Sequence, residues 1–347
     1  MSTPRWPSWF VAALASALVA ACGGGGDAGG RASTAAASSA SSASSGATST
    51  EAPRGVMAST DGRATTVATK VEVGGNACGV AVSGDTVWVT DAKAAKLVAV
   101  DAASGRVRAR YAVSATPCEV EVAAGSVWVT TQSGVVDRVD PRSGKVLASV
   151  ATGAASYETI GALGAVWVSN RNGQSITRIT PATNKGSTRS VGEVNAGGLV
   201  EEGGYLWVGD DTTGASAILR IDPRSWQATP VPTGGDRPGY VAATNGRVWV
   251  SNVKSGTVTG LDTTTLAPVG PPAPAGASPV NLKASADGKW VWVPDDVGDL
   301  VTRIDAATGA AVERVQVGAG PAVVAPSADG VWVTHFDDGS VWHLVLR

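Results

Sequence analysis

The sequence predicts an all-β fold: a seven-bladed β-propeller with four-stranded blades, in which the N-terminal strand joins the last blade and closes the ring. A tryptophan between apolar residues recurs at spacings of 40, 39, 40, 42, 43 and 40 residues, at Trp88, Trp128, Trp167, Trp207, Trp249, Trp292 and Trp332. Repeats of about 40 to 45 residues are typical of propeller blades. The 44 glycines fit many short strands joined by tight turns.

The N-terminus precedes the fold. Arg5 stands before an apolar stretch, residues 9–20, that is too short for a membrane span and fits a secretion signal over residues 1–21. The run from Leu18 to Cys22 resembles the lipobox of bacterial lipoproteins. That resemblance implies cleavage before Cys22, lipid on its sulfur, and a membrane partner in the periplasm or at the cell surface. The alternative is an ordinary secretory signal with a chance cysteine.

The next segment, residues 22–65, is rich in Gly, Ala and Ser and predicts a disordered tether, since it carries too few apolar groups to form a core. The propeller then occupies residues 66–347, with no second domain. The chain has 27 basic and 29 acidic residues, a formal charge of -2. Without a basic cluster we expect no nucleic-acid partner, and we expect a monomer.

The first repeat predicts four strands, near residues 79–83, 86–90, 96–100 and 107–113, and the other repeats follow the same plan. Val87, Trp88 and Val89 are all apolar, although successive strand residues point to opposite faces. Burial of both sheet faces between two neighbouring sheets is therefore expected.

A turn signature separates the third and fourth strands. An aspartate with a glycine four residues later, as in Asp101 with Gly105, predicts an Asx-type turn whose glycine has positive φ. Asn184 replaces that glycine in the third repeat. Once-per-blade aspartates are expected to form turns, not to catalyse: Asp101, Asp140, Asp222, Asp262 and Asp305.

The last repeat has room for only three strands. Residues 67–73, followed by Gly74 and Gly75, match the fourth-strand phase of the other repeats. This segment should complete blade seven and leave no open sheet edge between the chain ends.

The residues 125–130 and 135–144 resemble the repeats of bacterial YVTN and YncE-type propellers and of the streptogramin (virginiamycin B) lyase superfamily. The resemblance covers residues 66–347 and implies the fold, whereas propellers host many activities. Streptogramin lyases use histidine and glutamate on the channel rim with Mg²⁺, and this chain offers no second histidine there.

Polar residues outside the repeat suggest a ligand-binding rim at one end of the channel. They follow second strands or precede first strands: Asp91, Asn170, Asp210, Asn252, Asp295, Tyr157, Arg237 and Tyr240. The loops before the first strands also hold Glu119, Glu158 and Asn281. Such a rim suits a small polar ligand; the alternative is a solvated loop face.

His335 is the candidate for general acid or base catalysis, because imidazole titrates near neutrality and acids stand close in sequence. His343 lies within a strand and should be packed. No cofactor or metal is expected; the alternative is Mg²⁺ or Ca²⁺ at acidic pairs such as Asp337 and Asp338.

Cys78 and Cys118 each lie ten residues before a repeat tryptophan, so they occupy one phase in adjacent blades. Equivalent inner positions lie close near a propeller axis, and an exported protein can be oxidised. A disulfide is expected; separate buried thiols are the alternative.

Two functions follow. The first is a lipid-anchored binding or scaffolding propeller of the cell envelope, with an envelope protein or small polar ligand as partner, and not an enzyme. The second is a metal-dependent lyase or lactonase with its site on the channel rim.

Overall fold

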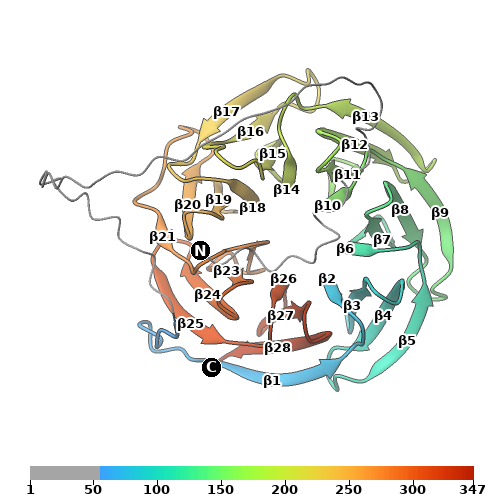
Figure 1. The fold of residues 1–347 in the computed structure, drawn as a ribbon, viewed down its shortest axis with the longest axis horizontal. Coiled ribbons are helices and arrows are strands. Elements are labelled where there is room, and N and C mark those ends of the chain that lie inside the picture. Colours follow the sequence, from blue (N-terminus) through green and yellow to red (C-terminus); the bar gives the residue numbers. More distant parts are fainter. Residues whose placement is uncertain (1–54) are drawn as a thin grey trace, which may run out of the picture. The chain divides into compact units, whose positions relative to one another are not determined.

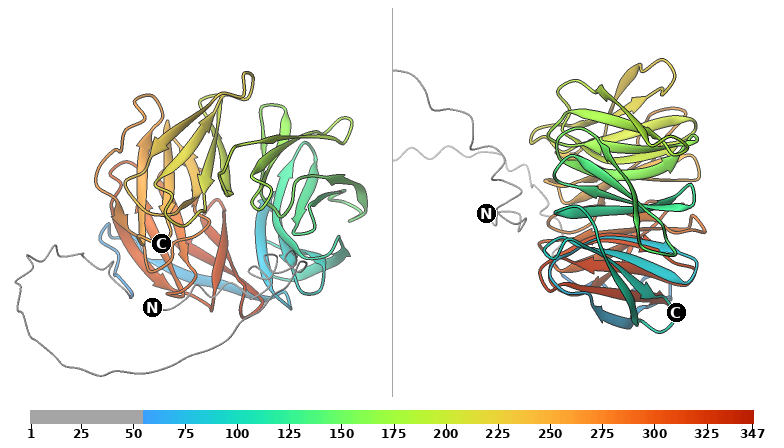
Figure 2. Two further views of the ribbon diagram at one scale, coloured as in Figure 1. Left: turned by 45° about the horizontal axis from the view of Figure 1, so that its top comes forward. Right: turned by 90° about the vertical axis from the view of Figure 1, so that its right-hand side faces the viewer.

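Seven antiparallel sheets of four strands form a closed ring in the computed structural model, which describes residues 55–347 (Figure 1). The strands run between the two faces of the ring, as the side view in Figure 2 shows. Each sheet is one blade, with its first strand beside the central channel and its last strand at the outer edge of the ring. The predicted fold class is confirmed. None of the described residues forms a helix that could span a membrane.

Blades one to three follow the chain without interruption. Their strands are β2 (Ala77–Ser83), β3 (Thr86–Asp91), β4 (Lys96–Asp101) and β5 (Val107–Ala112); β6 (Pro117–Ala123), β7 (Ser126–Thr131), β8 (Val135–Val139) and β9 (Val146–Ala151); β10 (Ser156–Ala162), β11 (Ala165–Asn170), β12 (Ser175–Thr180) and β13 (Lys185–Ser190).

Blades four to seven complete the ring. Their strands are β14 (Ala196–Glu202), β15 (Tyr205–Asp210), β16 (Ala217–Ile221) and β17 (Ala228–Pro232); β18 (Pro238–Thr244), β19 (Arg247–Asn252), β20 (Thr257–Asp262) and β21 (Ala273–Pro274); β22 (Lys283–Ala284), β23 (Trp290–Asp295), β24 (Leu300–Asp305) and β25 (Ala311–Gln316); β26 (Pro321–Pro326), β27 (Gly330–His335) and β28 (Ser340–Leu346), with β1 (Thr65–Glu72).

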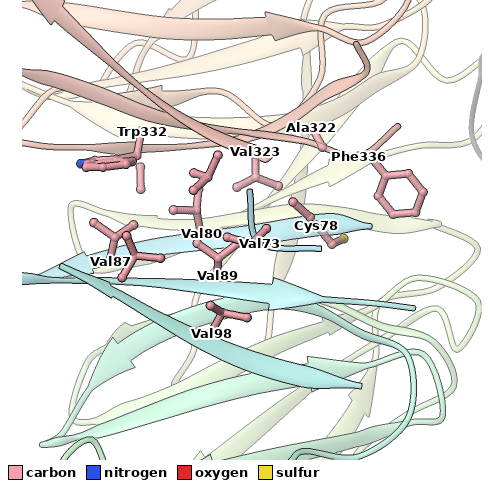
Figure 3. Packing of buried hydrophobic residues seen from close by; sticks show 14 of the residues in the cluster. Val73, Cys78, Val80, Val87, Val89, Val98, Ala322, Val323, Trp332 and Phe336 are labelled. Atoms are coloured by element: carbon pink, nitrogen blue, oxygen red, sulfur yellow. The ribbon is translucent and has the colours of Figure 1, made fainter. Parts of the chain in front are cut away.

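The repeated tryptophan joins each blade to the next one. Trp332 of blade seven packs against Val80, Val87 and Val89 of blade one (Figure 3). Trp88 in turn packs with valines of blade two. Because side chains alternate across a strand, the valines beside a tryptophan face the preceding blade while the tryptophan faces the following one. This confirms that both sheet faces are buried.

A buried hydroxyl links neighbouring blades close to the channel. It stands two residues after the tryptophan, at Thr90, Thr130, Ser169, Ser251 and Thr334, while Gly209 and Pro294 take this position in blades four and six. The Thr130 hydroxyl accepts the Glu119 N–H of its own blade at 3.0 Å and donates to the Tyr157 carbonyl of the next blade at 3.0 Å. Each such hydroxyl satisfies backbone groups that a buried inner strand would otherwise leave unpaired.

Blade seven is completed by the N-terminal strand, as predicted. β1 pairs with β28 in an antiparallel ladder that places Lys70 opposite Trp342 and Glu72 opposite Ser340. Figure 1 shows the blue β1 along the red β28 at the outer edge of the ring. The closure therefore joins residues from the two ends of the described chain.

Residues before the predicted boundary of the propeller already contact its blades. Residues 1–54, with the predicted signal and Cys22, lie outside the described residues, but Met57 forms a bridge with Arg314 of β25. Asp61 pairs with Arg303 at 2.6 Å, and the Arg303 side chain is 0% exposed. The end of the predicted tether (22–65) thus belongs to the propeller, because a buried guanidinium requires its carboxylate.

The turns confirm the aspartate signature. Asp101 accepts the backbone N–H of Ser104 at 2.7 Å, and Gly105 has a φ of 69°. Asn184 has a φ of 55°, as its replacement of glycine predicts. Trp226 and Leu266 take the same position in blades four and five with φ of 63° and 60°, so the turn imposes this conformation even on residues that disfavour it.

Replacing Asp61 by Asn should destabilise the ring although Asp61 lies outside every strand. We expect a loss of about 2–3 kcal/mol in the free energy of unfolding near neutral pH, because Arg303 keeps only Glu313 as a charged partner. Bonding to Arg303 holds the pKa of Asp61 well below its usual range. The stabilisation is therefore present above about pH 4 and is lost as the pH falls below it.

Urea unfolding of wild type and variant at neutral and acidic pH measures this effect. Asp85→Asn is the control, because Asp85 is 78% exposed and pairs with the surface residue Arg108. Equal stability of Asp61→Asn and Asp85→Asn at neutral pH would contradict the role of Asp61.

Candidate functional site

A cavity of about 350 Å³ occupies the channel, and the inner part of every blade contributes to its wall. Most of the wall is apolar, with residues such as Val82, Val122 and Leu199. Four ionisable side chains interrupt it: Glu119, Glu121, Glu158 and Lys283. We call these four residues, together with Asn281, the channel cluster.

The channel cluster connects blades that are far apart in the sequence. Lys283 Nζ of blade six contacts Glu158 Oε1 of blade three at 3.0 Å, across 125 residues. Asn281 donates to Glu119 Oε1 of blade two, across 162 residues. Glu158 is 97% buried at its side chain, and its Oε2 is a buried atom with no hydrogen-bond partner among residues 55–347.

The cluster occupies two positions of the repeat. Lys283 lies opposite Trp292, as Glu121 lies opposite Trp128, because the turn between β22 and β23 is two residues longer than in blade two. Glu119 and Glu158 lie nine residues before their blade's tryptophan, and Asn281 takes that position in blade six. Gly79, Gly198, Tyr240 and Val323 fill that position in the other four blades. The prediction named Glu119, Glu158 and Asn281 among the loops before the first strands, but missed Glu121 and Lys283. Comparison of the residues seven positions before each tryptophan would have found Glu121, whereas the longer turn of blade six moves Lys283 out of that spacing.

Burial and charge shift the pKa values of the cluster. Burial first, and then the Glu158 carboxylate, raise the pKa of Glu119 well above its ordinary value. Burial also raises the pKa of Glu121 to about 7. For Lys283, burial alone would lower the pKa, but Glu158 and Glu119 outweigh it and raise that pKa. The cluster therefore holds a charged pair beside two carboxyl groups that retain their protons more readily than usual.

Two tyrosines of the predicted rim meet at the other end of the inner strands. Tyr157 and Tyr240 place their hydroxyl oxygens 3.0 Å apart, joining blades three and five. Blade four lies between them and carries Gly197 and Gly198, where a Cβ atom would collide with the backbone of β18. These glycines let β14 and β18 approach closely. Tyr157 and Tyr240 are not among the residues that line the cavity.

The third predicted rim residue before a first strand, Arg237, joins an ion-pair group close to these tyrosines. Its Nε contacts Asp211 Oδ1 at 2.6 Å, and Arg171 pairs with the same carboxylate. The Arg171 guanidinium lies 5.3 Å from the centre of the Tyr157 ring. The structure thus brings Tyr157, Arg237 and Tyr240 into one region, where both tyrosines are buried.

The other five predicted rim residues do not form an exposed rim. They all stand three residues after the tryptophan, at the ends of the second strands: Asp91, Asn170, Asp210, Asn252 and Asp295. Asp295, for example, accepts the backbone N–H groups of Ala277, Ser278 and Gly298. Four of the five are buried and Asp210 is partly exposed. The aspartates thus accept N–H groups of the loops, which would otherwise lack acceptors. The amides of Asn170 and Asn252 donate instead to hydroxyls of the third strand.

His335 occupies this same position in blade seven, so the repeat does account for it. It is fully buried beside Trp342, and its Nδ1 lies 3.4 Å from the Ser340 hydroxyl. Burial lowers the pKa of His335 to about 4. Because His335 is 0% exposed, its placement on an open rim is corrected. It does not line the cavity either. His343 is packed as expected, stacked on Trp332 with ring centres 4.5 Å apart.

The two cysteines are neighbours but free. The structure holds Cys78 and Cys118 as buried thiols of adjacent inner strands, not as the expected disulfide. Interaction with Cys78 and burial raise the pKa of the Cys118 thiol well above its usual value. Cys78 and Cys118 belong to one apolar cluster with Val80 and Val323, where a thiol packs as a small apolar group.

The acidic pairs do not supply the alternative metal site. Within residues 55–347, no group of three or more His, Cys, Asp or Glu side chains is placed to hold a metal ion. Asp211 pairs with two arginines, and burial raises the pKa of Asp296 to about 7. The described residues therefore do not fit Mg²⁺ or Ca²⁺.

Comparison with solved structures confirms the fold. A streptogramin B lyase superposes with a TM-score of 0.70 at 17% identity, over 82% of this chain and 98% of that chain. A hydrazine synthase from Kuenenia stuttgartiensis gives 0.65 at 14% identity, over 78% and 95% of the two chains. The computationally designed Ika8 protein gives 0.62 at 12% identity, over 80% and 99%. The predicted relation to streptogramin lyases is thus confirmed for the fold.

No family model matches this chain, and no curated protein does.

Replacing Glu121 by Gln should change how stability depends on pH. Between about pH 4.5 and 7 the folded protein retains a proton on Glu121 that the unfolded chain releases. The free energy of unfolding of wild type therefore falls as the pH rises through this window. The free energy of unfolding of the variant lacks this decrease. We therefore expect the difference between variant and wild type to shift in favour of the variant from acid to alkaline pH, by on the order of 3 kcal/mol.

Urea unfolding at about pH 5 and about pH 8 compares the two proteins. Glu193→Gln serves as the control because Glu193 is exposed. Its free energy of unfolding should differ from that of wild type by nearly the same amount at both pH values. A Glu121→Gln difference that is the same at both pH values would contradict the raised pKa.

Proposed function

We propose that this chain is an exported, lipid-anchored, monomeric propeller that binds a small ligand in its central channel. The observation that carries the proposal is the channel cluster, in which charged side chains from blades two, three and six converge on one cavity. The cavity lies within the range of about 300–1,000 Å³ that is usual for ligand pockets.

The energetic cost of the cluster supports this proposal. Taking an ion pair out of water costs free energy, and an apolar pair of similar size is often equally stable or more so. Blades one and seven show that glycine or valine is compatible with the position of Glu158. Blades one, five and seven have alanine opposite the tryptophan, where Lys283 stands in blade six. Groups that break a local packing rule in this way are typical of functional sites.

Binding is favoured over catalysis by the character of these groups. The raised pKa of Lys283 keeps its amine protonated, so it is a poor nucleophile or base. The predicted catalytic residue, His335, is absent from the cavity wall. No contact within the described part of the chain favours the lyase or lactonase alternative.

A channel variant tests the binding function. Glu158→Gln with Lys283→Met removes both charges with little change in volume, and a small-molecule library is screened by ligand-observed NMR. Ligands of wild type should lose at least tenfold in affinity, or about 1.4 kcal/mol, with the variant. The matched control, Glu193→Gln with Lys185→Met, removes the same charges from exposed positions and should bind as wild type does.

Retention of every ligand by the channel variant would contradict a channel site. Chemical conversion of a bound ligand by wild type, absent in the channel variant, would instead establish an enzyme.

The anchor is supported by the sequence from Leu18 to Cys22 alone. In a bacterial host, Cys22→Ser should release the protein from the membrane fraction, because two or more acyl chains are needed for stable anchoring. Labelled fatty acid should appear in wild type only. Equal fractionation of wild type and variant, without label, would overturn the lipoprotein proposal and leave the channel proposal intact.

A further inference from the structure

We propose that the ligand of the channel is an aliphatic ammonium ion, whose N–H groups bond to Glu158 and Glu119 while its apolar body lies against the channel wall. The inference rests on the proposed function, because it specifies the ligand class of the same cavity.

The balance of charges around the cavity favours a cation. Three carboxyl groups line it, at Glu119, Glu121 and Glu158, against the single amine of Lys283. Lys283 is committed to one oxygen, Glu158 Oε1, at 3.0 Å. A bound cation would also favour the ionised forms of Glu119 and Glu121, whose pKa values burial raises. Once Glu119 or Glu121 is ionised, an anion would meet repulsion from these groups.

The balance of hydrogen bonds points the same way. Glu158 Oε2 is a buried acceptor without a partner, and leaving such an atom unpaired costs about 1–3 kcal/mol or more for a charged group. Among residues 55–347, the side chain of Glu119 has one hydrogen-bond donor, the amide of Asn281, which bonds to Oε1. The cluster therefore has more acceptors than donors. An ammonium group brings three donors and no acceptor, as lysine does.

The wall explains why the cation should be organic. Valine, isoleucine and leucine side chains surround the cluster, among them Val122, Ile160 and Leu199. Divalent cations such as Mg²⁺ and Ca²⁺ require a shell of about six or more oxygens, which these side chains cannot supply. An aliphatic body would bury apolar surface against them, at about 25 cal/mol per Å².

The arrangement of the inner strands orients the ligand. The cavity wall includes Val82, Val122, Ala243 and Pro326, which lie at or near the ends of their strands. Tyr157 and Tyr240 bond to each other near the starts of their strands. A ligand is therefore expected to enter from the face where the inner strands end, with its ammonium group directed toward Glu158.

Three molecules of one shape test the inference. Cyclohexylammonium, cyclohexanol and cyclohexanecarboxylate share a ring and differ in the charge of the head group. Titration calorimetry should show ammonium binding at least tenfold tighter than the alcohol, with no binding of the carboxylate. Glu158→Gln should weaken ammonium binding at least tenfold, whereas Glu193→Gln, a surface control, should leave it unchanged.

Wild-type protein alone provides a second measurement if Glu158→Gln does not fold. Ammonium affinity should rise from about pH 6 to about pH 8, as Glu121, whose pKa burial raises to about 7, loses its proton in the presence of Glu119, Glu158, Lys283 and the neighbouring Cys118 thiol. Affinity that is constant or falls over this range would overturn the inference.

The remaining outcomes separate the inference from the proposed function. Channel-dependent binding of the alcohol or carboxylate in preference to the ammonium would overturn the ligand class and leave a binding propeller. Tighter binding of Mg²⁺ or Ca²⁺ would do the same. Failure of cyclohexylammonium to bind overturns the inference, while the library screen with the double channel variant decides whether the channel binds anything.

Discussion

The alternation of valine and tryptophan in the second strand of each blade is the constraint on which the structure depends. Trp88 faces blade two while Val87 and Val89 face blade seven, so one short segment supplies both faces of its sheet. A sheet with two apolar faces is stable only between two others, which requires a closed ring. The closed ring also depends on β1, which pairs with β28 and completes blade seven.

That constraint leaves the inner strands comparatively free. Backbone groups near the channel are satisfied by the hydroxyls that link neighbouring blades, such as Thr130 and Thr334. Side chains nine residues before the tryptophan are then free to differ in chemistry. Glycine and valine occur there, and so do Glu119 and Glu158. The channel is the part of the ring where the repeat can change residue type without losing the fold.

The sequence predicted the elements that follow directly from the repeat: the blades, the aspartate turns and the strand closure. It did not reveal contacts between blades, because the repeat period gives the position of a residue within its own blade and does not show which residues of other blades it contacts across the channel. The pairing of Asn281 with Glu119 is one such contact. His335 was separated from Asp91 and Asn252 because these residues differ chemically, although all three end a second strand. Asp61 was assigned to the tether because composition does not reveal a single buried partner, Arg303.

The central claim is that charged residues of different blades act together in the channel. A double-mutant cycle for Glu158→Gln and Lys283→Met, measured by urea unfolding, tests it most directly, since the two residues are 125 positions apart in sequence but 3.0 Å apart in space. We predict an interaction energy of about 1–3 kcal/mol between the two changes. Effects that add to within about 0.5 kcal/mol would show that the two side chains are not coupled, and would contradict the channel cluster on which the proposed site rests.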